Sequence, residues 1–110
     1  TLLITGTSRN DTRADQLVLD QNADPLDAML EELQRRDVRS VLVEGGAQLL
    51  GHFIARGLWN EARVITGTAR FNGGTHAPVF DRDPVRTMMS GTDRIDCFTN
   101  GTPIADTWAW

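Results

Sequence analysis

The amino-acid sequence predicts an α/β domain that ends in an antiparallel hairpin. Short apolar runs with the period of strands alternate with amphipathic segments with the period of helices, as in a sheet with helical connections. Residues 40–57 contain a strand pattern, two glycines and a helix pattern in succession. Near the C-terminus, two strand-like runs flank Asn100 and Gly101, a dipeptide typical of tight hairpin turns.

The first third of the chain predicts two strands and a helix. Residues 1–5 and 16–19 are short apolar runs that predict strands, and residues 6–12 between them are polar and turn-rich. Asp24 suits a helix N-cap and Pro25 the first helical position, so we expect a helix over residues 25–36. Its apolar residues share one face: Leu26, Met29, Leu30 and Leu33. The opposite face carries pairs of charges four residues apart: Glu31, Glu32, Arg35 and Arg36.

Residues 40–57 predict a strand, a glycine turn and a helix in succession. Residues 41–43 are apolar and predict a buried strand that ends at Glu44. Gly45 and Gly46 allow a sharp turn and leave no side chain between the backbone and a ligand. Residues 47–56 then predict a helix, and Gly57 suits the position after its end. This order would present free N–H groups to a phosphate at the edge of a sheet, although many such turns use glycine only to reverse the chain.

The remaining chain predicts strands joined by loops. Residues 62–69 read as a strand, residues 71–80 as a glycine-rich loop and residues 81–93 as an irregular segment. Residues 94–99 and 102–110 are the two strands of the expected hairpin.

Composition limits the possible functions. The 110 residues suffice for one domain or part of one, and the net charge of −4 argues against nucleic-acid binding through bulk electrostatics. No apolar run approaches the length of a membrane span. Two histidines and a single cysteine do not suggest a metal site. The lone Cys97 fits a reducing, cytoplasmic compartment, and a first residue Thr1 inside a strand pattern leads us to expect a fragment of a longer chain.

Two motifs in combination resemble the reductase domain of the bifunctional riboflavin-biosynthesis deaminase–reductase. They are residues 41–46, followed by the amphipathic helix, and the glycine-rich residues 73–78 one strand later. The resemblance extends over all 110 residues and is strongest between residues 41 and 78, with a departure at Phe71 and Asn72. It implies a dihydrofolate reductase-like mixed sheet with flanking helices and a C-terminal antiparallel hairpin. Residues 1–110 would then be the C-terminal portion of that reductase domain, without its upstream half.

The resemblance implies an NADPH-dependent reduction of a ribosylamino-pyrimidine phosphate (5-amino-6-ribosylamino-uracil 5′-phosphate) to the ribitylamino product. The cofactor's pyrophosphate would face a glycine turn and the first amides of the helix: Gly45, Gly46, Ala47, Gln48 and Leu49. The adenosine half would meet Thr5, Thr7 and Ser8, and Arg9 would pair with a 2′-phosphate. The alternative for these last four residues is an ordinary polar loop.

Glu44 is the candidate catalytic residue that the resemblance points to. It would orient the substrate or move a proton during opening of the sugar ring; alternatively, it only caps nearby N–H groups. His52 and His76 are weaker candidates. Two other functions stay open, a non-catalytic nucleotide-binding module and a reductase of the same fold with another heterocyclic substrate. We further expect a homodimer or a docked upstream half over Trp108 and Trp110, and no turnover from residues 1–110 alone.

Overall fold

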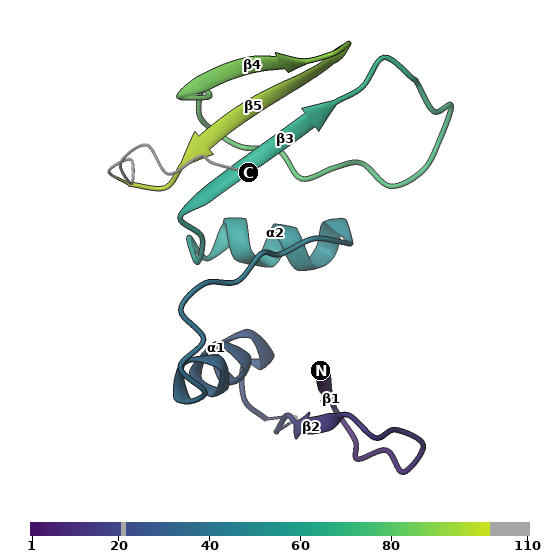
Figure 1. Ribbon diagram of the computed structural model, residues 1–110, viewed down its shortest axis with the longest axis vertical. Coiled ribbons are helices and arrows are strands. Elements are labelled where there is room, and N and C mark those ends of the chain that lie inside the picture. Colours follow the sequence, from purple (N-terminus) through teal and green to yellow (C-terminus); the bar gives the residue numbers. More distant parts are fainter. Residues whose placement is uncertain (21, 102–110) are drawn as a thin grey trace. The chain divides into compact units, whose positions relative to one another are not determined.

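The computed structural model describes residues 1–20 and 22–101. The chain divides into two compact units, residues 1–42 and residues 43–110. The first contains a two-stranded parallel sheet and a helix, and the second a helix and a three-stranded antiparallel sheet (Figure 1). This combination of helices with parallel and antiparallel strands confirms the predicted α/β class.

The first unit follows its sequence pattern closely. Strands β1 (Leu2–Thr5) and β2 (Asp15–Val18) pair in parallel, with Leu3 opposite Gln16 and Thr5 opposite Val18. Helix α1 (Pro25–Arg35) comes next and buries Leu26. The two strands and the helix are therefore confirmed within a residue or two of their expected bounds.

Both ends of α1 are capped. The Asp24 carboxylate accepts hydrogen bonds from the backbone N–H groups of Leu26, at 2.9 Å, and Asp27, at 3.4 Å. At the other end Asp37 takes a left-handed conformation with φ of 58°, and Val38 N–H donates to the carbonyl of Leu33. This is a Schellman motif that is closed by an aspartate where glycine is usual.

The second unit is built around a central strand. It contains α2 (Ala47–Ala55), β3 (Glu61–Thr66), β4 (Arg86–Ser90) and β5 (Asp93–Thr99). In the sheet β5 lies between β3 and β4 (Figure 1). Val64 and Thr87 are therefore opposite Asp96 on either side. Its core includes three buried residues: Phe53, Cys97 and Phe98.

The link from α2 to β3 is fixed by a glycine and an asparagine. Gly57 follows the helix with φ of 63°, and Leu58 N–H donates to the Phe53 carbonyl, which confirms the predicted helix end. The side-chain amide of Asn100 donates to the carbonyls of Gly57 and Trp59 at 2.9 and 3.0 Å. Asn100 thereby ties the end of β5 to the connection before β3.

The predicted strand over residues 40–44 is wrong. These residues form no regular structure, and Val41 and Leu42 are 50% and 74% exposed. A strand needs a neighbour to accept and donate its backbone hydrogen bonds. Among residues 1–20 and 22–101, no strand pairs with this segment, so its apolar pattern lacks the partner that would make it a strand.

The C-terminal hairpin exists, but it lies earlier in the chain than predicted. Its turn is at Gly91 and Thr92, and its first strand is β4, in the segment that was expected to be irregular. The predicted second strand, residues 102–110, lies outside the described residues. Strand β5 pairs with β3 on one edge and with β4 on the other. Strand β3 also ends earlier than the predicted residue 69.

Candidate functional site

The glycine turn before α2 has the backbone geometry that the sequence predicts. Gly45 has φ of 119°, a conformation that residues with a side chain rarely adopt, and Gly46 is the N-cap of α2. No side chain caps this helix, and its first turn contains no acidic residue. A Cβ atom built on either glycine would meet nothing within 4 Å, so the backbone of this turn is open to a ligand.

The first amides of α2 are potential donors. The N–H groups of Ala47, Gln48 and Leu49 have no carbonyl one turn earlier within the helix, whereas Leu50 N–H already donates to the Gly46 carbonyl at 3.2 Å. Together with the partial positive charge of a helix N-terminus, they form a donor set that suits an anion.

Glu44 immediately precedes this turn, but its surroundings differ from the prediction. It is exposed and lies on an irregular segment, not at the end of a buried strand. His52 on α2 and His76 in the long loop after β3 are also exposed.

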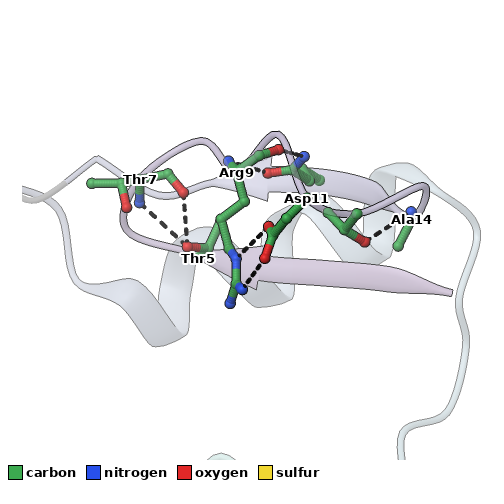
Figure 2. A network of polar contacts seen from close by, with 7 residues as sticks. Thr5, Thr7, Arg9, Asp11 and Ala14 are labelled. Carbon is green, nitrogen blue, oxygen red and sulfur yellow. Dashed lines mark hydrogen bonds and ion pairs between the residues drawn. The ribbon is translucent and has the colours of Figure 1, made fainter.

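The loop between β1 and β2 carries the second group of predicted site residues (Figure 2). The Thr5 hydroxyl donates to the Thr7 carbonyl at 2.9 Å and accepts from the Thr7 N–H at 3.3 Å. The Thr5 side chain thus shapes the turn, while Thr7 and Ser8 are exposed. Their hydroxyl groups lie in the part of the loop that follows the carboxyl end of β1.

Arg9 is held in place by two residues that the sequence reasoning did not identify. Its backbone N–H donates to the Gln16 side chain at 2.8 Å, and its carbonyl accepts from the same side-chain amide at 2.6 Å. Its guanidinium donates twice to Asp11, at 2.9 and 2.5 Å (Figure 2). This pairing raises the pKa of Arg9 and lowers that of Asp11. An arginine and an aspartate two positions apart are the sequence feature that could have predicted this ion pair.

An open groove of about 330 Å³ lies at the carboxyl ends of the two parallel strands. It is lined by Gly6, Leu19, Asp20, Ala23 and Pro25. In sheets of this kind, ligands bind beyond the carboxyl ends of the strands. The groove begins at Gly6, the first residue after β1.

The predicted site residues fall into two groups, one in each unit. Thr5, at the end of β1, and Thr7 and Ser8, on the loop after it, lie in the first unit. Residues 44–49 lie in the second unit and comprise Glu44, the glycine turn and the first residues of α2. Across residues 1–20 and 22–101, no group of three or more histidine, cysteine or acidic side chains could hold a metal ion. No helix in the same residues is long and apolar enough to cross a membrane.

Comparison with known proteins identifies the family. A 2,5-diamino-6-ribosylamino-4(3H)-pyrimidinone 5′-phosphate reductase from Archaeoglobus fulgidus is 42% identical over 53 residues, which are 48% of this chain and 24% of that protein. The chain thus matches about a quarter of this relative's length. No solved structure matches. The family model of the RibD C-terminal domain matches residues 1–97. This chain therefore belongs to the RibD C-terminal domain family, a reductase family with the dihydrofolate reductase-like fold.

Proposed function

We propose that this chain is the cofactor-binding portion of an NADPH-dependent reductase of riboflavin biosynthesis. The reaction would convert the ribosylamino side chain of a pyrimidine phosphate to a ribitylamino chain. Membership of the RibD C-terminal domain family and the name of the A. fulgidus relative support this function. The observation that carries it is the open glycine turn at Gly45 and Gly46 with the uncapped N-terminus of α2 behind it.

The residues of this turn would bind the pyrophosphate. Because no Cβ stands at Gly45 or Gly46, the phosphate oxygens can approach the backbone closely. The amides of Ala47, Gln48 and Leu49 then donate to those oxygens, as in other phosphate sites at helix N-termini. When bound, NADPH supplies the hydride.

Glu44 would act on the substrate. As the sugar ring opens, the bond between C1 and the ring oxygen breaks, and that oxygen must gain a proton. A carboxyl group beside the glycine turn can hold this proton or orient the ribose. The exposure of Glu44 leaves it accessible to a substrate.

The substrate of our proposal is 5-amino-6-ribosylamino-uracil 5′-phosphate. The relative is named for the corresponding 2,5-diamino-pyrimidinone, which shares the ribosylamino phosphate arm and differs in the ring. Turnover of the full-length protein with each compound distinguishes them. Binding of NADPH without turnover of either would favour a non-catalytic nucleotide-binding module, and turnover of another heterocycle would favour a different reductase of this fold.

A substitution at Gly46 tests the cofactor site. Gly46→Val places a branched side chain where the backbone must meet the phosphate, so we expect NADPH affinity to fall more than tenfold, or by more than ~1.4 kcal/mol. Gly51→Val is the matched control, because it adds the same side chain to the same helix and also meets nothing within 4 Å. Unchanged NADPH affinity in a folded Gly46→Val protein would falsify the proposed site.

Backbone groups without a strand partner support two further proposals. Residues 41–43 have no strand partner among residues 1–20 and 22–101, and β3 has one free edge. Unpaired edges of this kind are usually completed by another segment or chain. We therefore expect residues 1–110 alone to lack turnover, and the full-length protein to be a homodimer. The predicted contribution of Trp108 and Trp110 to that interface lies outside the described residues.

A further inference from the structure

Strand β4 lies at an edge of the antiparallel sheet. It pairs with β5, and among residues 1–20 and 22–101 no strand pairs with its other side. An unpaired edge presents backbone N–H and C=O groups that can bind a further strand. Apolar side chains are exposed here as well, since Val85 is 57% and Met89 is 62% exposed. The edge therefore offers both backbone groups and apolar surface to a partner.

The hairpin determines which backbone groups of β4 face this edge. A two-residue turn joins β4 to β5 after Ser90. The residues that flank such a turn, here Ser90 and Asp93, form a hydrogen-bonded pair, and hydrogen-bonded pairs alternate along the ladder from there. Every second residue of β4 therefore directs its N–H and C=O toward β5. The two residues between them, Thr87 and Met89, direct theirs toward the free edge.

We propose that the second copy in the homodimer proposed above binds at this edge, with the two β4 strands antiparallel about a two-fold axis at Met88. In this register Thr87 of each copy lies opposite Met89 of the other. Both outward N–H groups of each copy then donate to the outward carbonyls of its partner. The contact is the same for both copies, as a two-fold interface requires, and the sheet continues from one copy into the next.

The neighbouring two-fold registers use fewer of these groups. An axis at Thr87 places Met89 opposite Val85, whose N–H already donates to the Cys97 carbonyl of its own chain at 2.8 Å. An axis at Met89 places Thr87 opposite Gly91, which lies in the hairpin turn. Only the axis at Met88 pairs outward-facing residues of the strand with one another throughout.

The charges of the hairpin favour the same register. Arg86 is the one charged residue of β4, and it lies opposite Ser90 of the second copy, whose neighbour on β5 is Asp93. These three residues share one face of the extended sheet, so the long Arg86 side chain can extend over the small Ser90 to the Asp93 carboxylate. In the described part of the chain, neither Arg86 nor Asp93 forms an ion pair. The dimer thus gives each charge an opposite partner.

Cysteine cross-linking of the full-length protein tests the register. Met88 and its copy form a non-hydrogen-bonded pair, with Cα atoms ~4.5 Å apart, which is within the range of a disulfide. Met88→Cys should therefore give a covalent dimer with oxidised glutathione. The matched controls are Thr87→Cys and Met89→Cys. Neither should cross-link alone, but a mixture of the two should, because these positions face each other. Cys97 is 0% exposed, and the parent protein gives the background.

The backbone donors are tested by a second pair of variants. Met89→Pro removes one outward N–H from each copy and no bond to β5, as proline on an edge strand allows. At a protein concentration at which the parent is a dimer by light scattering, Met89→Pro should be a monomer. Met89→Ala keeps the N–H and should remain a dimer. Circular dichroism shows that each variant is folded.

The possible results separate this interface from the other proposals. A dimer in which Met88→Cys does not cross-link, equal cross-linking of all three single variants, or a folded Met89→Pro protein that stays dimeric would overturn the inference, while the homodimer would survive with another interface. A parent protein that is monomeric would overturn both the inference and the homodimer. NADPH binding and turnover are measured separately, so the proposed reductase function does not depend on these outcomes.

Discussion

Removal of the Asn100 side chain should destabilise the second unit. The Asn100 side-chain amide donates to the carbonyls of Gly57 and Trp59. Its oxygen accepts from the Arg82 guanidinium at 3.2 Å, and its backbone N–H donates to the Asn60 carbonyl at 2.8 Å. Asn100→Ala keeps the backbone contact with Asn60 but removes the two side-chain bonds to the connection between α2 and β3.

The size of the effect follows from the bonds that are lost. Each neutral hydrogen bond contributes a net ~0.5–1.5 kcal/mol, and the exposed contact with Arg82 adds little. The two bonds to carbonyls therefore predict a loss of about 1–3 kcal/mol in the free energy of unfolding. With a urea dependence of about 2 kcal/mol per molar, the midpoint should fall by about 1 M.

Urea unfolding of the full-length protein, followed by circular dichroism, measures this shift. Asn72→Ala is the matched control, because Asn72 is exposed in the loop between β3 and β4 and should change the midpoint little. Asn100→Asp keeps the shape but turns the donor into an acceptor that faces two carbonyls, so it should be at least as harmful as alanine. If Asn100→Asp matched the wild-type midpoint, the two donated bonds could not be responsible for the stability.

Three further outcomes are expected. Asp24→Ala removes the N-cap of α1 and should cost about 1 kcal/mol of stability, measured by thermal unfolding; an unchanged Tm would contradict the capping role. Gly45→Ala should cost about 1–3 kcal/mol because its φ of 119° strains a residue with a Cβ, whereas Gly46→Ala, at φ of −48°, is free of that strain. Two arginines hydrogen-bond the Glu32 carboxylate and lower its pKa from 4.5 to about 2; the stability that it contributes is therefore complete above pH 4.5 and lost as the pH falls toward 2. Glu32→Gln should not show this loss of stability when unfolding is measured as the pH is lowered. An equal loss in the wild-type and variant proteins would exclude the contribution of Glu32.

The elements that the sequence predicted well are those with local signals. Helix α1 has an N-cap aspartate, a proline in its first turn and an apolar face, and these features need no distant partner. The end of α2 at Gly57 is equally local, because only the backbone conformation of one residue decides it. The sharp turn at Gly45 and Gly46 was predictable for the same reason.

The failures concern features that depend on pairing. The apolar pattern of residues 41–43 is compatible with a strand, but a strand forms only where a neighbour supplies backbone partners. The dipeptide Asn100–Gly101 suggests a turn, but it gives no sign that the side chain of Asn100 ties the end of β5 to the connection before β3. In the same way, the contact between Arg9 and Gln16 depends on the register of two strands, which composition and periodicity do not reveal.

The burial of Cys97 has a practical consequence. It is the chain's single cysteine and is 0% exposed, on the strand that pairs with both neighbours of its sheet. A thiol reagent can reach its sulfur only when the groups that cover it move away. The rate of labelling under native conditions therefore measures opening of the structure around β5, and it requires no introduced probe. Because a bound ligand slows such opening only where it stabilises the closed form, the same reaction would report whether cofactor binding is coupled to the antiparallel sheet.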